Sequence, residues 1–455
     1  MTKGEESNKK VIMKKTLVKY PYLTEDVEIY ERENGHKIVL AHKEGELVNV
    51  STWVKTGSIN EDDTNNGISH FLEHLMFKGT HKHKAGYFDK TLEAKGAIVN
   101  AATWKDYTFY YVTLPRGENC KDLNLAIELH ADMMLDPILP DDEIGAPFDL
   151  NNPKVTDKRE RHVVIEEIRM RKDQNWTKVY NACNFNMYTK HPYKRDVIGT
   201  PEIISQVTRD EIMNYYKTFY SPENMTTIIV GDFDKNAILE KVEKEFDFKG
   251  RENAPKCINE IDLPTDKTLF IENNGKVNTS YLMIGWLGPK ASQLKENIEL
   301  DIISIILGDS TSSRMYQNLI EKLPEPIFNM ANAEHYQFKD GNNFFVQANF
   351  KPEKRETALE LVKKEITDLL NNKISDEELA KAKKKIKSRF AYAAETVSEI
   401  GETIGYYMTV CEDLKLVEEY LADLDSITIE DIESTIRKYL NLDNSVISLL
   451  EPERV

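Results

Sequence analysis

The sequence predicts an α+β protein built from two homologous halves, and three observations support this fold class. Alternation typical of strands and three-to-four-residue spacing typical of helices are mixed along the chain without a regular strand–helix–strand order, which favours mostly antiparallel sheets. A chain of 455 residues is too long for one hydrophobic core, so two or more domains are expected. The third observation is an internal repeat that divides the chain near its middle.

The repeat is clearest toward the end of each half. Residues 207–212 are echoed by residues 427–432, at an offset of 220 residues. Each copy then finishes with an apolar strand, at 226–230 and at 445–450. Because a period this long indicates duplicated domains and not a solenoid, we expect two halves of about 220 residues, each a mostly antiparallel sheet flanked by helices.

Composition sets the expected boundaries. Residues 1–20 are Lys-rich and lack the apolar core of a secretory signal, so they are predicted to form a solvated tail. The first half is assigned to 21–248. A change of composition with several Gly and Pro residues predicts a linker at 249–264, and the second half follows at 265–455.

The elements of the first half follow from local patterns. An Asn-Gly turn signal predicts a hairpin between the first two strands, and a stretch rich in Pro, Gly and Asn at 144–157 predicts a loop. The expected strands are 27–32, 37–42, 48–55, 97–103 and 107–114, and the expected helices are 67–79, 85–95, 122–135 and 158–173.

Charge and cysteine content narrow the class of partner. Sixty Lys and Arg against 77 Asp and Glu give a formal net charge of −17, which argues against nucleic acid as a partner. The four cysteines are scattered without a C-x-x-C pair and are expected to be free thiols in a reducing compartment. No apolar run has membrane-spanning length, so we expect a cytoplasmic protein without a membrane partner.

The helix expected at 67–79 carries two faces. His70, Glu73 and His74 share one face, and two histidines four residues apart on a helix can meet one metal ion. The order H-x-x-E-H occurs among metallopeptidase motifs, and a carboxylate beside the metal suits a general base. The other face is a stripe of apolar residues at core spacing, namely Ile68, Phe71, Leu72, Leu75 and Met76.

The spacing alone leaves a second interpretation open, because two His and a Glu also occur by chance on ordinary solvated helices. Context favours the metal. Of the ten His, His81 and His83 are two residues apart and point in different directions, and six others are isolated. These eight are expected to be surface or locally satisfied residues.

Five stretches together resemble the pitrilysin family of zinc peptidases, which includes the mitochondrial processing peptidase and small bacterial peptidases. They lie at 67–80, 99–103, 160–168, 192–200 and 308–317. The resemblance covers nearly the whole chain, including its two-half layout. It implies a peptide-binding chamber enclosed by the halves, a Zn²⁺ cofactor and hydrolysis of peptide bonds.

The resemblance implies His70, His74 and a distal Glu as zinc ligands, with Glu73 as the base. Aligning the motif selects Glu167 over Glu166. Helical spacing agrees, because residues 160, 164 and 167 share a face while residue 166 points toward solvent.

Glu160 matches a second family carboxylate that orients or tunes the site; an ordinary surface ion pair is the competing interpretation. Between His74 and Glu167 lie 92 residues, more than the family usually has. The excess coincides with the loop at 145–158, which we interpret as a surface insertion. Whether this insertion contacts the site or is passive is left open.

Substrate contacts are expected on both halves. Asn100, Ala101 and Ala102 resemble the edge strand to which relatives bind an extended peptide, although an ordinary edge strand has the same sequence pattern. In many relatives the second half supplies an Arg and a Tyr that grip the substrate. Here those positions hold Ile320 and Ile327, and a shift of one residue offers Phe328 in place of the Tyr.

The sequence therefore predicts a zinc-dependent endopeptidase that cleaves short, extended or unfolded peptides. The missing Arg and Tyr predict that it is the metal-bearing subunit of a dimer, with a second family subunit supplying the clamp; a homodimer is the other possibility. The alternative function is a non-catalytic assembly subunit that retains a relic zinc site. A purely structural zinc fits less well, because only three protein ligands are evident.

Overall fold

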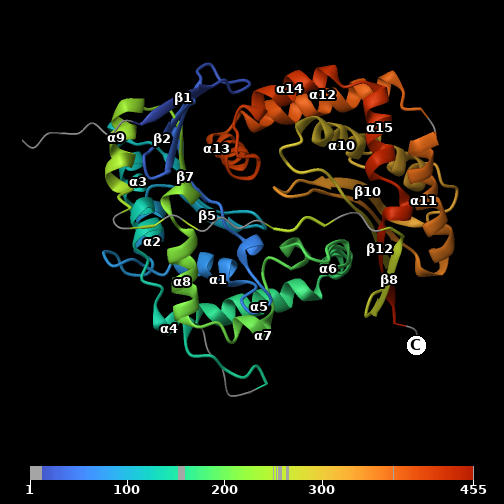
Figure 1. Cartoon of the computed structure of the whole chain (residues 1–455), viewed down its shortest axis with the longest axis horizontal. Helices are drawn as coiled ribbons and strands as arrows, with labels where there is room; N and C mark the ends of the chain where they lie inside the picture. Colours follow the sequence, from blue (N-terminus) through green and yellow to red (C-terminus); the bar gives the residue numbers. More distant parts are fainter. Residues whose placement is uncertain are drawn as a thin grey trace, which may run out of the picture.

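The computed structural model describes residues 13–151, 159–248, 251–252, 254, 259–262, 266–371 and 373–453. The chain forms two lobes, each built on one sheet with helices around it (Figure 1). The first sheet has seven strands and the second has five. The prediction of an α+β fold with two sheets flanked by helices is confirmed.

All neighbours in the first sheet are antiparallel except β3 and β7, which run parallel. The β2–β3 hairpin turns at Gly35, whose φ of 89° favours glycine. In spatial order the strands are β1 (Lys14–Val18), β2 (Val27–Glu31), β3 (Lys37–His42), β7 (Met225–Gly231), β4 (Leu47–Val54), β6 (Thr108–Pro115) and β5 (Ile98–Thr103).

Helices of the first half pack on one face of this sheet and form its largest apolar core with strands β3, β4 and β6. They are α1 (Ile68–Met76), α2 (Tyr87–Glu93), α3 (Lys121–Leu135), α4 (Asp141–Ile144), α5 (Glu160–Asp173), α6 (Asn175–Met187), α7 (Pro201–Ile204), α8 (Arg209–Phe219) and α9 (Lys235–Glu245). Of these, α6 leaves the common face, as described below.

The second sheet is also antiparallel apart from the parallel β12–β8 pair. Its spatial order is β10 (Phe328–Tyr336), β11 (Asn343–Phe350), β9 (Ser280–Leu287), β12 (Val446–Pro452) and β8 (Leu269–Gly275). The accompanying helices are α10 (Leu294–Leu307), α11 (Arg355–Asn371), α12 (Asp376–Ala393), α13 (Val397–Tyr406), α14 (Leu416–Ser426) and α15 (Ile429–Tyr439).

Short helical turns complete the chain. Six are 3₁₀ turns: η1 (Ser58–Asn60), η2 (Glu118–Cys120), η3 (Pro192–Lys194), η4 (Pro222–Asn224), η6 (Pro352–Lys354) and η8 (Leu442–Asn444). Two are π-helical, η5 (Tyr316–Glu321) and η7 (Tyr407–Cys411). Among the residues that the structure describes, no helix combines the length and the apolar character that crossing a membrane requires.

The internal repeat seen in the sequence is the same capped helix in each half. Thr208 caps α8 and Thr428 caps α15, each in a reciprocal capping box with the acidic residue three positions on. Each helix then leads through a 3₁₀ turn into a buried strand: β7 at the centre of the first sheet, or β12 between β9 and β8 in the second.

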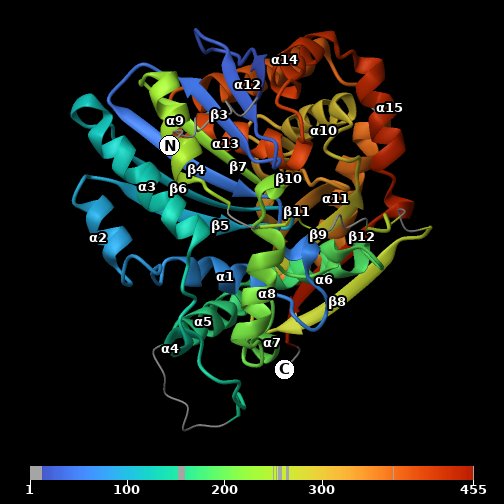
Figure 2. The same cartoon turned by 60° about the vertical axis from the view of Figure 1, so that its left-hand side comes forward.

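The halves exchange one helix each. Helix α6 of the first half packs on β9 and β12, and α13 of the second half packs on β4 and β7. Figures 1 and 2 show α13 against the first lobe and α6 beside the strands of the second. The contact is close, because a Cβ added at Gly405 of α13 would lie 2.0 Å from the indole ring of Trp53.

One expected boundary changes, that of the N-terminal tail. The predicted tail at 1–20 is too long, because residues 14–18 form β1 and both Val18 and Tyr20 are buried. The physical reason is that Val18 and Tyr20 lie two residues apart and pack into the same apolar cluster as Val27 and Val39. Within the expected linker, the described residues belong to no helix or strand; the others, including 255–258 and 263–265, lie outside the described part of the chain.

Candidate metal centre

Helix α1 places His70, Glu73 and His74 on one side because its apolar stripe is buried on the other. It starts directly after Gly67, which has a φ of 96° and lies so close to the Ile198 carbonyl oxygen that a Cβ would sit 2.7 Å away. Only glycine fits this start. His70 is 8% exposed and Glu73 is 9% exposed, so the polar face of α1 is itself largely covered.

Helix α5 brings the third predicted ligand to α1. Val164 and Ile168 are buried against the core, which turns Glu167 toward the histidines. Glu167 Oε2 lies 3.5 Å from His74 Nε2 and 3.8 Å from His70 Nε2. One ligand atom from each of the three side chains lies within 4.8 Å of the others.

This donor set fits a zinc ion. Two imidazole nitrogens and one carboxylate oxygen are zinc ligands, and three protein ligands leave a position for water or substrate. By contrast, the Glu166 side chain is 67% exposed and pairs with Arg169. The structure therefore gathers His70, His74 and Glu167, as the motif predicted, and turns Glu166 away.

Glu160 lies at the first turn of α5 and contacts the back of His74. Its Oε1 accepts a hydrogen bond from His74 Nδ1 at 2.9 Å, and its Oε2 pairs with Lys78. A partner on Nδ1 fixes the tautomer and ring orientation and leaves the Nε2 lone pair free for a metal. The structure favours this orienting role over the surface ion pair, because the Glu160 side chain is only 12% exposed.

The two histidines differ in their electrostatics. Burial lowers the pKa of His70 to about 3, and the neighbouring His74 lowers it further. Burial also acts to lower the pKa of His74, but its hydrogen bonds to Glu160 and Glu167 outweigh burial and raise that pKa to about 9. The hydrogen bond from His74 in turn lowers the pKa of Glu167.

Glu73 is held at the end of strand β5. Its Oε2 accepts a hydrogen bond from Thr103 Oγ1 at 2.5 Å, and burial raises the pKa of Glu73. Sequence reasoning missed Thr103. The period of two along a strand could have found it, because it puts residue 103 on the same face as Ala101, which packs toward the core under α1.

Strand β5 is an edge strand of the first sheet, as expected, and pairs only with β6. Asn100, Ala101 and Ala102 occupy its middle. The backbone edge away from β6 is therefore available to an extended chain. Contact of these three residues with a substrate stays a prediction.

The second half does not bring the remaining expected contact to the metal centre. Phe328 is 6% exposed and packs in the core of the second half, with its ring centroid 6.0 Å from that of Phe350. A side chain buried in this way is a core residue, so the expectation that Phe328 contacts substrate is corrected. Ile327 is equally buried, and Ile320 packs against the same core.

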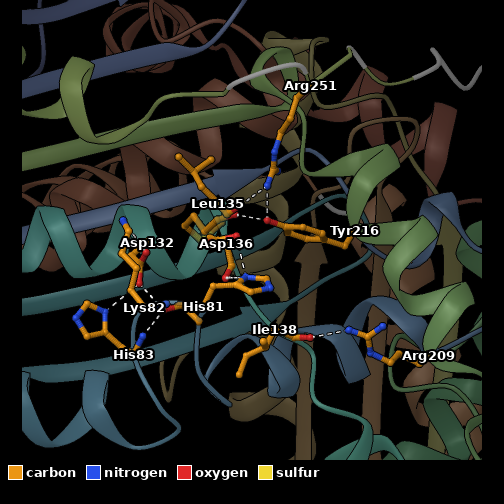
Figure 3. Close-up of polar contacts among 12 residues, drawn as sticks. His81, Lys82, His83, Asp132, Leu135, Asp136, Ile138, Arg209, Tyr216 and Arg251 are labelled. Atoms are coloured by element: carbon orange, nitrogen blue, oxygen red, sulfur yellow. Dashed lines mark hydrogen bonds and ion pairs between the residues drawn. The ribbon is translucent and has the colours of Figure 1, made fainter.

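His81 and His83 lie apart, as their spacing predicted. His83 Nδ1 lies 3.0 Å from Asp132 Oδ2, whereas His81 Nδ1 lies 2.9 Å from Asp136 Oδ1 (Figure 3). The two rings contact different carboxylates one helical turn apart on α3 and its end. These are local polar contacts, and among the described residues the two histidines share no candidate metal group.

Arg161 is a second residue that sequence reasoning missed. It is 1% exposed and follows Glu160 directly. Its guanidinium donates to five backbone carbonyls at 2.6–3.1 Å, those of Ile144, Gly145, Ile204, Ser205 and Val207. These bonds tie the start of the insertion and the α7–α8 connection to α5. No pattern in the sequence distinguishes this arginine from a solvated one.

Comparison with known proteins gives a consistent result. Residues 37–200 match the family described as Insulinase (Peptidase family M16), and residues 206–386 match the Peptidase M16 inactive domain. The chain is 28% identical over 438 residues to the zinc protease PqqE of Helicobacter pylori, covering 92% of this chain and 91% of that protein. It is 24% identical over 424 residues to the uncharacterized zinc protease YmxG of Bacillus subtilis, covering 93% and 98%.

Solved structures share the fold. The crystal structure of a protease from Helicobacter pylori superposes with a TM-score of 0.82 at 26% identity, covering 97% of this chain and all of that one. The first half of the periplasmic protease PqqL from Escherichia coli gives a TM-score of 0.74 at 19% identity, covering 93% and 92%. Against the structure of PqqL, the chain covers 48% of that chain.

Proposed function

We propose that this chain, which belongs to peptidase family M16, is a zinc-dependent endopeptidase. M16 is the pitrilysin family that the motifs predicted. The observation that carries the proposal is the convergence of His70, His74 and Glu167 beside Glu73. The group lies next to the end of an edge strand, where a peptide backbone can be held.

His70, His74 and Glu167 would hold a zinc ion, which would supply a Lewis acid that makes water a better nucleophile and polarises the scissile carbonyl. Glu73 accepts a proton from the attacking water as the water oxygen bonds to the carbonyl carbon. The same carboxyl group then gives the proton to the leaving amine nitrogen, and the C–N bond breaks. Thr103 fixes the direction of the Glu73 carboxylate, and Glu160 keeps the His74 ring in position.

Short, extended or unfolded peptides are the proposed substrates. A peptide that adds to β5 exchanges main-chain hydrogen bonds with Asn100, Ala101 and Ala102, so affinity comes from the backbone. The small side chains at 101 and 102 let the two backbones approach closely. A folded protein does not present a free extended segment to this edge.

We also propose that the enzyme works as the metal-bearing subunit of a dimer. Ile320 and Ile327 occupy the positions at which related chains are expected to carry the Arg and Tyr, and both pack in the core. A second family subunit that supplies this clamp completes the site in a heterodimer; a second copy of this chain is the other possibility. The match to about half of PqqL supports a functional unit of two such chains.

A cytoplasmic location is proposed as well, because Cys120, Cys183 and Cys411 are free thiols. The rival function is a non-catalytic assembly subunit that retains zinc as a relic. The absence of a clamp residue at 320 and 327 is the observation that favours it.

The deciding experiment is hydrolysis of unstructured peptides by the zinc-loaded chain, alone and mixed with a second family subunit. Chelation with 1,10-phenanthroline is expected to abolish hydrolysis, and added Zn²⁺ to restore it. Hydrolysis that survives chelation overturns the zinc mechanism, and a bound zinc without hydrolysis in either mixture supports the relic. Full efficiency of the chain alone, as a monomer, contradicts the dimer.

A further inference from the structure

The turn at residues 104–106 connects β5 to β6 and follows Thr103 directly. Thr103 is the residue that donates to Glu73. Contacts that fix this turn therefore also fix the hydrogen bond from Thr103 to Glu73, the proposed base. The turn is buried on two sides, with Lys105 at 4% exposure and Asp106 at 6%.

The first half holds one side of the turn. Lys105 Nζ donates to the carbonyl oxygens of Tyr193 and Arg195. The Ile59 N–H donates to the Lys105 carbonyl at 2.8 Å, and the Ser58 N–H donates to the Trp104 carbonyl at 3.3 Å. These contacts fix residues 104 and 105 but leave the Asp106 carboxylate to be satisfied elsewhere.

One donor from each half satisfies it. Asp106 Oδ2 accepts the backbone N–H of Lys339 at 3.0 Å, and Oδ1 accepts the Tyr193 hydroxyl. The Tyr193 oxygen accepts the N–H of Asp340 at 3.1 Å, and Asp340 Oδ2 lies 3.2 Å from His191 Nε2. Lys339 and Asp340 lie in the connection between β10 and β11, so this hairpin reaches across to the turn.

A buried carboxylate is costly unless donors satisfy it, and hydrogen bonds to a charged group are stronger than neutral ones. Two donors satisfy Asp106, one from each half. The hairpin also covers the turn with apolar contact, since the ring of Phe338 lies 5.2 Å from that of Tyr193 and 5.6 Å from Lys105 Nζ. The turn is therefore fully satisfied only when the two halves are docked.

We propose that the second half takes part in the reaction through this contact. Its β10–β11 hairpin holds the 104–106 turn, the turn holds Thr103 against Glu73, and Asp106 is the positioning residue that transmits the contact. The role in catalysis rests on the proposed function. It gives the second half a task that does not require the missing Arg and Tyr.

The first arm of the test needs no activity. Amide hydrogen exchange is measured on the metal-free full chain for peptides that cover 98–108. Asp106→Ala is expected to raise exchange there at least tenfold, with the α1 and β7 peptides unchanged. Asp234→Ala is the matched control, because Asp234 also accepts a backbone N–H, that of Ala237 at 2.8 Å, but does so as the N-cap of α9. Unchanged exchange at 98–108 in Asp106→Ala overturns the proposal.

The second arm measures kcat and zinc content of the loaded enzyme. Displacement of a catalytic group by about 1 Å lowers the rate by up to about 100-fold. Asp106→Ala is therefore expected to lower kcat by about 10- to 100-fold, with zinc content unchanged. The reason for unchanged zinc is that Asp106 contacts none of the three ligands. Should Asp106→Ala not fold, Tyr193→Phe removes one of the two donors to Asp106, together with the acceptor of the Asp340 N–H, and is expected to act in the same direction.

A double substitution separates positioning from general damage. If Asp106 acts through Thr103, then adding Asp106→Ala to Thr103→Val lowers kcat no further than Thr103→Val alone. Losses that multiply show two independent effects and contradict the proposal. A wild-type chain without chelator-sensitive hydrolysis overturns the proposed function, whereas the exchange arm still decides whether the hairpin holds the turn.

Discussion

Helices α1 and α10 follow corresponding strands in the two halves but bury different groups. In α1, the imidazole of His70 and the carboxylate of Glu73 are covered yet face Glu167 of α5. In α10, Asp301 accepts from Tyr420 at 2.6 Å and contacts His335 Nδ1 at 2.7 Å. The polar face of α1 thus gains a third metal ligand from a second helix, whereas the carboxylate on α10 is satisfied by a tyrosine and a histidine of its own half.

The largest expected effect comes from replacing Glu73, the proposed general base on α1. Glu73→Gln keeps the size of the side chain and its contact with Thr103 but removes the proton acceptor. Loss of a general base lowers rate by about 10²- to 10⁴-fold, so kcat is expected to fall by that factor while zinc remains bound. Peptide hydrolysis and metal analysis on the same sample provide the measurement.

His70→Ala is the companion variant and is expected to lose both zinc and hydrolysis, because it removes a ligand. Glu166→Gln, on the solvent side of α5, is the control for both and is expected to match the wild type. Undiminished hydrolysis by Glu73→Gln rules out the assigned base.

The next effect concerns Glu160, which contacts Nδ1 of the proposed ligand His74. Glu160→Gln weakens the hold on His74 Nδ1, and loss of such partners reduces metal affinity about 10- to 100-fold. Competition with a zinc-binding dye measures this affinity, with Glu166→Gln again as the reference. Equal zinc affinities for the two variants mean that Glu160 does not support zinc binding and only pairs with Lys78.

Much of this site was predictable because its information is local. Spacing within α1 and within α5 fixes which side chains share a face, so the shared faces of His70 with His74 and of Glu160 with Glu167 required no tertiary knowledge. The role of Glu160 came from the family resemblance. The pairing of the two helices came from a family resemblance, and Phe328 shows its limit. The motif with a one-residue shift placed Phe328 at a substrate position, but both Ile327 and Phe328 are buried in the core of the second half.

The third prediction tests the helix that the second half places on the first. Gly405→Ala puts a methyl group against the ring of Trp53, and overpacking of this kind costs about 1–3 kcal/mol, although alanine favours helix by up to about 1 kcal/mol. Chemical denaturation measures the loss.

Gly288→Ala is the matched control within the second half, because its new Cβ would meet ordinary contacts at 3.4–3.5 Å. It is expected to change the free energy of unfolding by no more than about 0.5 kcal/mol. Equal stability of the two variants contradicts a tight fit between α13 and the first sheet.

The smallest effect is a pH dependence inside the first half. Burial lowers the pKa of His36 and of His130 from 6.5 to about 3, with Arg32 adding to the effect at His36. The unfolded chain therefore binds these protons at higher pH than the folded one. The contribution to stability is present above pH 6.5 and is lost as pH falls toward 3.

Two such groups lower the free energy of unfolding by about 1 kcal/mol between pH 7 and pH 6. His130→Gln is expected to remove about half of this dependence, whereas His81→Gln, at an exposed site, leaves it intact. Denaturation curves at the two pH values provide the measurement. An unaltered slope in His130→Gln shows that the buried imidazole is not the source.

Fold class and the duplicated layout were visible in the sequence because periodicity and capping are written in neighbouring residues. Thr208 and Thr428 begin equivalent helices for this reason. The exchange of α6 and α13 could not be predicted from the sequence, because an apolar helix face can pack on either sheet. Strand β1 was missed because a short edge strand preceded by lysines resembles a solvated tail.

The packing of α13 on the first sheet also delays the burial of that sheet during synthesis. One face of the first sheet, including Trp53 and Phe109, is covered by residues of α13, which starts at Val397, about 150 residues beyond the end of the first half. At roughly 5–20 residues per second on the ribosome, that apolar face waits about 10–30 s for its cover. The first half therefore keeps this apolar face exposed until α13 is made, although its metal ligands have emerged long before.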